Sequence, residues 1–212
     1  MVRGNGTPLK DKILSEARRV LEEEGVGALS TRRLAKAVGC TATALYLYFD
    51  NKEALLHVLM EEGFAKLGAH LEGPSRIAES LSKVRGLARA YVDFGLANPA
   101  WYELMFQLPP ERLGSDYPAE KYRAGRRHLE RLSDALAETN HASDPGAALA
   151  ASTLLWSSLH GLVALLNAGR IDASLDRDQL IEAALQRAVP LVAPTPTTPA
   201  AIPATGSPDL AS

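Results

Sequence analysis

Apolar residues recur at the three- and four-residue spacing of an α-helix along nearly the whole chain, and no stretch alternates convincingly enough to predict a strand. Glycine and proline divide this pattern into segments of helix length, for instance at Gly39, Gly73-Pro74 and Asn98-Pro99. With 46% hydrophobic and 23% charged residues, the 212-residue chain has the composition of a protein that buries a core. We therefore predict an all-α protein of about nine helices.

Capping residues predict where several of these helices begin. Thr7-Pro8 supplies an N-cap followed by proline at the first helical position. Ser30, Thr41 and Asp176 are further candidate N-caps, and Asp50–Glu53 has the pattern of a capping box that opens a long helix. The later helices are expected at residues 76–97, 99–107, 118–139, 145–168 and 177–189.

Charge divides the chain into two parts. Residues 1–52 carry nine Lys or Arg against six Asp or Glu, a net charge of +3, while the remainder carries 14 against 19, a net charge of -5. A basic N-terminal module on an acidic body suits local phosphate binding. We predict a helix-turn-helix domain at 8–52, a helical effector-binding and dimerisation domain at 53–193, and a disordered Pro/Ala/Thr-rich tail at 194–212.

Cysteine usage and the N-terminal residues favour a cytoplasmic protein. Cys40 is the single cysteine, so no internal disulfide can form, and no Cys/His group has metal-ligand spacing. Residues 1–12 contain no apolar run, so we expect no signal peptide. We expect a cytoplasmic location, no metal and no cofactor.

One long segment is apolar enough to raise the question of a membrane. Residues 145–169 carry no Asp, Glu, Lys or Arg, but they include six polar residues and neither flank has a basic bias. A helix that is apolar nearly all round is also expected where one face packs on its own core and the other on a partner subunit. We predict that this segment is a dimerisation helix and that the protein does not enter a membrane.

The stretch from Ser30 to Leu56, STRRLAKAVGCTATALYLYFDNKEALL, carries the strongest functional signal. Two short amphipathic helices are joined by a tight turn at Gly39-Cys40. This is the helix-turn-helix arrangement, in which the second helix lies in the major groove of DNA. Small side chains open that helix and let it approach base edges closely. They are Thr41, Ala42, Thr43 and Ala44.

The same stretch resembles the tetracycline-repressor (TetR) family over about residues 10–60. The family signature is a threonine-led helix, a glycine turn and a Leu-Tyr-x-x-Phe-x-x-Lys-x-x-Leu run. The matching residues here are Thr31, Ala35 or Ala37 before Gly39, then Leu45, Tyr46, Phe49, Lys52 and Leu55. The turn, aromatic and lysine spacings agree together, which makes the resemblance specific.

The resemblance implies which residues contact DNA. Thr31 and Arg32 correspond to positions that touch phosphate and base, and Tyr46 and Lys52 correspond to phosphate clamps. Tyr48 departs from the histidine that many members have, but its hydroxyl can still donate to a phosphate. The predicted DNA-binding residues are Thr31, Arg32, Thr41, Ala42, Thr43, Ala44, Tyr46, Tyr48 and Lys52. The alternative for the aromatic residues is a role in the core, which we expect for Phe49.

The C-terminal half resembles, more weakly, a subgroup of TetR C-terminal domains named for Trp, His and Gly. Trp156-x-x-x-His160-Gly161 carries this resemblance, and spacing of four places the tryptophan and histidine on one helix face. They either line an effector pocket or belong to the core, with the histidine bonded to a neighbouring helix. A second aromatic group follows Asn98-Pro99, with Tyr91 and Phe94 just upstream. The candidate effector-binding residues are Trp101, Tyr102, Phe106, Trp156 and His160.

Together these features predict a homodimeric transcriptional repressor that binds an approximately palindromic operator and is released by a small, largely apolar ligand. An enzyme is a poor alternative, because Ser157, Ser158 and His160 point in diverging directions and no nucleophile elbow or P-loop is present. A helical small-molecule-binding protein without DNA binding would leave the N-terminal motif unexplained.

Overall fold

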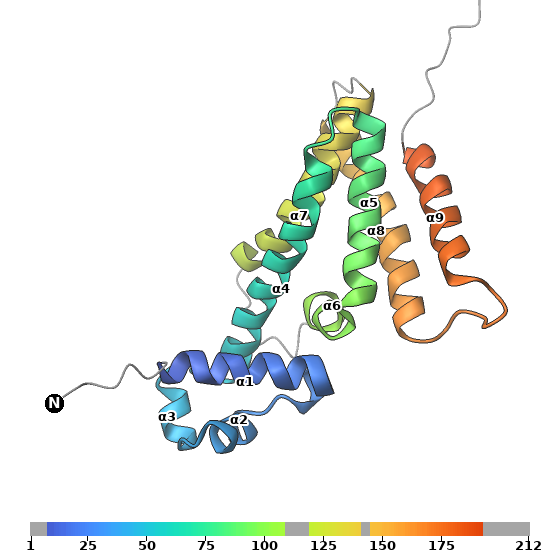
Figure 1. The fold of residues 1–212 in the computed structure, drawn as a ribbon. Coiled ribbons are helices and arrows are strands. Elements are labelled where there is room, and N and C mark those ends of the chain that lie inside the picture. The colour runs from blue at the N-terminus through green and yellow to red at the C-terminus, as the bar shows by residue number, and fades with distance from the viewer. Residues whose placement is uncertain (1–7, 109–118, 141–144, 193–212) are drawn as a thin grey trace, which may run out of the picture.

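The computed structural model describes residues 8–108, 119–140 and 145–192, and all regular structure within these ranges is helical. The helices are α1 (Leu9–Glu24), a short 3-10 helix (Val26–Ala28), α2 (Thr31–Val38), α3 (Ala42–Tyr46), α4 (Lys52–Ser75), α5 (Ser80–Ala97), α6 (Pro99–Phe106), α7 (Ala119–Asn140), α8 (Pro145–Asn167) and α9 (Arg177–Val192). Their order confirms the predicted all-α fold (Figure 1). The tail predicted at 194–212 lies outside the described residues.

Local capping chemistry sets several helix starts as predicted. Ser30, Thr41 and Asp176 each accept a hydrogen bond from the backbone N–H three residues further on, at distances of 3.2, 3.1 and 2.8 Å. These bonds satisfy N–H groups that would otherwise lack a partner in the first turn of a helix.

Several predicted boundaries are wrong by one to four residues. Helix α4 continues through Pro74 to Ser75, α9 ends at Val192 rather than at 189, and three helix starts differ for identifiable reasons. Pro8 has a ψ of 143°, so it occupies the N-cap of α1 rather than its first helical position. Asn51, not Asp50, caps α4, which places Glu53 at the second helical position, too early to complete a capping box. Helix α5 begins four residues later than expected, because the carboxylate of Glu79 caps it by accepting bonds from the N–H groups of Leu81 and Ser82 at 2.9 and 2.6 Å.

Helices α1, α2 and α3 form a module at one end of the molecule. Leu34 of α2, Leu45 of α3 and Phe49 are at most 3% exposed and share an apolar core with Ile13 and Leu21 of α1. Figure 1 shows α2 and α3 on the side of α1 that faces away from the body. The core role expected for Phe49 is confirmed.

Helix α4 leads from this module into the body, where it packs against α5, α6 and α7. Helix α8 packs against α5, α7 and α9 with one face, which buries Ser152, Leu155, Leu159 and Val163. Leu154 and Leu165 are exposed on its opposite face, and Leu149 is exposed nearer the buried one. By length and hydropathy, Gly146–Asn167 is the one membrane-span candidate among the described residues. Its inner face belongs to the core of the body.

Candidate DNA-binding and effector-binding sites

The turn between α2 and α3 depends on the backbone conformation of Gly39. Its φ of +73° and ψ of +33° lie in the left-handed region, which glycine adopts without the steric penalty of a side chain. The N–H of Cys40 donates to the carbonyl of Ala35 at 2.9 Å and closes the turn. Helix α3 therefore starts abruptly, and its first residues are left exposed on the surface of the module.

Most of the predicted DNA-contact residues lie on this open surface. Arg32, Thr41, Ala42, Thr43, Tyr46 and Tyr48 are exposed, and Thr31, Ala44 and Lys52 are half-buried. The fold brings Thr31 and Tyr46 together, with the two hydroxyl oxygens 3.3 Å apart. Residues from the start of α2 and the end of α3 thus share one polar surface.

Two adjacent arginines of α2 have different environments. Arg33 forms a bidentate ion pair with Glu24 of α1, one arm of which is 2.7 Å long, and this pairing holds the pKa of Glu24 below its ordinary value. Arg32 is exposed and has no ion-pair partner among the described residues. Arg33 therefore ties α2 to α1, whereas the guanidinium of Arg32 is available to an external anion.

The structure adds Leu47 to the residues on this surface. It caps the C-terminus of α3 and is 81% exposed, between Tyr46 and Tyr48, which are 47% and 45% exposed. Sequence analysis did not single it out, because an apolar residue in a helical pattern is expected to be buried. The available signal was its position two residues after Leu45, which must face the core.

A group of rings from α5, α6 and α8 forms what we call the aromatic–histidine cluster. Its members are Tyr91, Tyr102, Phe106, Trp156 and His160, and the ring centroids of contacting pairs lie 5.0–6.2 Å apart. Four of the five predicted effector-binding residues therefore come together, although they are far apart in the sequence. Tyr91, which the sequence suggested only as an upstream neighbour, completes the group.

A directional hydrogen-bond chain runs through this cluster. The indole N–H of Trp156 donates to the hydroxyl of Tyr91 at 3.1 Å. The hydroxyls of Tyr91 and Tyr102 are 3.0 Å apart, and the hydroxyl of Tyr102 is 2.5 Å from Nδ1 of His160. Because the indole can only donate, the chain is consistent when each tyrosine donates onward and Nδ1 accepts. The imidazole then carries its proton on Nε2.

Burial keeps the cluster uncharged. Desolvation raises the pKa of Tyr91 to about 12, raises that of Tyr102 as well, and lowers the pKa of His160 below its ordinary value. All three groups are therefore neutral at pH 7. A set of neutral rings with a few fixed polar atoms suits an apolar ligand without charge.

Trp101 does not lie in the cluster. It is 2% exposed and faces the DNA-binding module, where its Nε1–H donates to Glu22 of α1 at 2.8 Å. Lys66 of α4 lies 4.1 Å above the indole ring and 3.1 Å from the same carboxylate oxygen. The structure thus places Trp101 at the junction of α1, α4 and α6 rather than with the other predicted effector residues.

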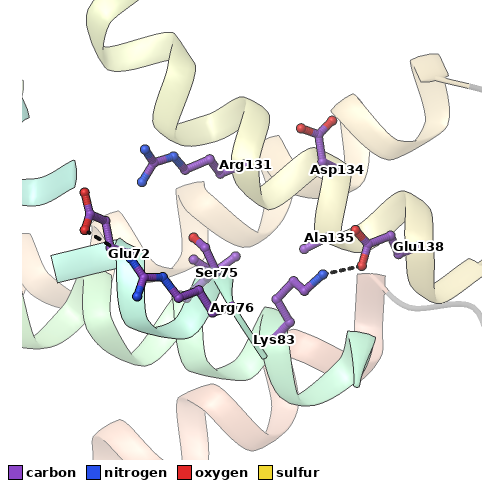
Figure 2. Close-up of a pocket in the computed structure, with 9 residues that line it drawn as sticks. Glu72, Ser75, Arg76, Lys83, Arg131, Asp134, Ala135 and Glu138 are labelled. Atoms are coloured by element: carbon purple, nitrogen blue, oxygen red, sulfur yellow. Dashed lines mark hydrogen bonds and ion pairs between the residues drawn. The ribbon is translucent and has the colours of Figure 1, made fainter. Parts of the chain in front are cut away.

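A polar cleft of about 350 Å³ lies at the other end of the body, between α4, α5 and α7. Two ion pairs lie along it, Lys83 with Glu138 at 2.5 Å and Arg76 with Glu72 at 3.9 Å. Figure 2 marks both pairs and shows Arg131 and Asp134 beside them. Within the described part of the chain, no three His, Cys, Asp or Glu residues gather in a way that could hold a metal ion.

Two family models match the chain and agree with this geometry. The model described as "Bacterial regulatory proteins, tetR family" matches residues 13–59, which include α2 and α3. The model described as "Tetracyclin repressor-like, C-terminal domain" matches residues 84–188. The chain belongs to the TetR family. The narrower resemblance to the subgroup named for Trp, His and Gly stays a prediction.

Individual TetR-family relatives match part of the sequence and most of the fold. The HTH-type transcriptional regulator Rv1816 of Mycobacterium tuberculosis is 29% identical over 104 residues, which are 48% of this chain and 44% of the relative. The chain thus spans about half the length of the curated relatives it matches. A Rhodococcus sp. RHA1 protein of unknown function has 26% identity and a TM-score of 0.74, with 92% of this chain and all of the other covered.

One structural neighbour was solved with its ligands. AibR, in complex with isovaleryl coenzyme A and operator DNA, has a TM-score of 0.62 and 19% identity over 84% of this chain and 96% of its own. At this identity the likeness concerns the fold alone.

Proposed function

We propose that this chain is a cytoplasmic, homodimeric transcriptional repressor that binds an approximately palindromic operator and leaves it when a small, neutral, largely apolar ligand binds. The observation that carries the DNA-binding part is the exposed surface of α2 and α3, where Arg32 lacks an ion-pair partner among the described residues while its neighbour Arg33 is bound to Glu24. An unpaired guanidinium beside small side chains matches the needs of phosphate and base contact in the major groove.

The direct test is binding of the purified protein to DNA upstream of its own reading frame, measured by fluorescence anisotropy against an unrelated duplex of equal length. We expect specific binding that Arg32→Ala weakens about 10- to 100-fold. The matched control is Lys36→Ala, which removes an exposed charge from the last turn of α2 and should change the affinity by less than about threefold. Equal affinity for the two duplexes would contradict the proposal.

The dimer is proposed to form through α8 and α9. The outer face of α8 carries exposed leucines and no charge, and a partner subunit would cover it. A symmetric dimer presents two α3 helices, which can occupy successive major grooves only at a spacing of about 34–36 Å. On this proposal residues 8–52 bind DNA, and residues 53–193 hold the effector and the interface.

We further propose that the effector binds at the aromatic–histidine cluster and acts through α6. This helix carries Tyr102 and Phe106 in the cluster and Trp101 against α1. A ligand that displaces the first two would move the helix that contacts the DNA-binding module. Such a ligand releases DNA only if it binds the altered conformation better than the DNA-bound one. AibR, which has the same fold and was solved with isovaleryl coenzyme A and operator DNA, supports the proposal that one such protein binds both a small molecule and DNA.

A further inference from the structure

His128 of α7 extends the ring contacts of the aromatic–histidine cluster to another helix. Its imidazole stacks on Phe64 of α4, with centroids 6.1 Å apart and an interplanar angle of 22°. Phe64 in turn meets Phe106 edge to face, at 5.6 Å and 86°. A continuous row of rings therefore joins His128, through these two phenylalanines, to His160 of α8.

One nitrogen of His128 is buried without a partner. Nδ1 has no hydrogen-bond partner among the described residues, while the imidazole bonds to the backbone carbonyl of Phe64. Since Nδ1 is unpartnered, Nε2 makes that bond and carries the proton, which leaves a lone pair on Nδ1. Gly68 makes this approach possible, because a Cβ there would lie 3.1 Å from Cε1 of the imidazole.

The charge state of His128 agrees with this assignment. Burial, assisted by the nearby Arg131, lowers its pKa below the ordinary value, so the ring is neutral at pH 7 and Nδ1 is an acceptor. A buried polar atom without a partner is costly, and few persist in native proteins without a role or an external partner.

We propose that Nδ1 of His128 accepts a hydrogen bond from the effector, which would make the effector a neutral ring compound that carries a hydroxyl or N–H donor. The inference rests on the proposed effector site and narrows its ligand class. The rings of Phe64 and Phe106 would contact the apolar part of the ligand, and Nδ1 of His128 would accept the hydrogen bond from its hydroxyl or N–H group. A ring compound of similar shape without a donor would leave Nδ1 buried and unpaired, so the protein should bind that compound much more weakly.

The test compares 2-naphthol with 2-methoxynaphthalene, which has similar rings but no donor, by isothermal titration calorimetry on the full-length protein. We expect wild type to bind 2-naphthol at least about 10-fold more tightly than the ether. His128→Phe keeps a ring against Phe64 but removes the acceptor, and it should bind the two probes within about twofold of each other. His70→Phe is the matched control, because His70 lies on the exposed side of α4 and should keep the wild-type preference.

The outcomes separate this inference from the proposed function. If wild type fails to bind 2-naphthol or does not prefer it to the ether, or if His128→Phe keeps the preference, the role of His128 is refuted. If Trp156→Ala loses 2-naphthol while His128→Phe binds it like wild type, the effector site stands and only this inference fails. If both variants bind it like wild type, the ligand sits outside the cluster and both proposals fail. Thermal unfolding of each variant checks that it is folded, and His128→Leu, which also lacks an acceptor, replaces His128→Phe if that variant is not folded.

Discussion

The hydrogen bond between Trp101 and Glu22 links α6 of the body to α1 of the DNA-binding module, and its strength can be measured. Trp101→Phe removes the indole N–H that donates to Glu22 at 2.8 Å, while it keeps an aromatic ring beneath Lys66. Glu22→Ala removes the acceptor from the other side. The two single variants and the double variant form a double-mutant cycle that isolates the pairwise interaction from the cavity left by the smaller ring.

The expected coupling is about 1 kcal/mol. A hydrogen bond to a charged group is worth about 1.5–3 kcal/mol net. The side chain of Glu22 is 49% exposed and also binds Lys66, so water and the ammonium group compensate for part of the loss. This compensation lowers the expected coupling free energy to about 0.5–1.5 kcal/mol. Trp101→Phe alone should cost more, about 2–3 kcal/mol, because the ring is 2% exposed and its replacement leaves a void.

Urea unfolding followed by far-ultraviolet circular dichroism is the appropriate assay, since the substitution itself changes tryptophan fluorescence. The matched control is a second cycle between Trp156→Phe and Glu22→Ala. Trp156 donates to Tyr91 inside the body, at 3.1 Å, and should show no coupling to Glu22. A coupling below about 0.3 kcal/mol between Trp101 and Glu22, or an equal one in the control cycle, would refute the link between α6 and α1.

Three further predictions concern DNA, assembly and pH. Lys52→Ala should weaken binding to all DNA sequences alike and reduce the dependence of log K on log salt by about one, whereas Arg32→Ala should also relax sequence preference; anisotropy titrations across salt distinguish them. Leu154→Arg, at a position 65% exposed in the single chain, should shift dimer to monomer in light scattering while helicity is retained; a persisting dimer would contradict the proposed interface. Burial lowers the pKa of His128 and His160 in the native state, and unfolding restores it to about 6.5. Below that pH the unfolded state binds more protons than the native state, so Tm should fall from pH 7 to pH 5, and it should fall less steeply in His128→Phe.

Helix order and several caps followed from the sequence because they depend on local chemistry. Ser30 and Thr41 cap their helices with bonds that span three residues, and Gly39 supplies the left-handed turn between them. The prediction that Asp50 caps α4 was wrong, because Asn51 accepts the hydrogen bond from the N–H of Ala54. Spacing along the sequence does not carry that information.

The aromatic–histidine cluster could be predicted only in part, for a geometric reason. Trp156 and His160 are four residues apart and therefore share a face of α8, as expected. Trp101 and Tyr102 are consecutive, so their side chains project about 100° apart on a helix and cannot both face the same group of rings. Proximity in the sequence therefore does not place Trp101 beside Tyr102 in the cluster, and its effector-binding role stays a prediction. The position of Tyr91 opposite them depends on tertiary packing alone.

The same 100° separation gives α6 its place in the proposed switch. Tyr102 is bonded to His160 in the body, and the preceding residue in the chain, Trp101, is bonded to Glu22 of the DNA-binding module. Both residues belong to the eight-residue helix α6, so on the proposed mechanism a displacement of Tyr102 is passed to Trp101. Because binding free energies are reciprocal, a ligand that weakens operator binding through this helix must itself bind more weakly, by the same factor, when the operator is present. The Trp101–Glu22 bond, which joins α6 to α1, is therefore one contact through which the proposed switch would act.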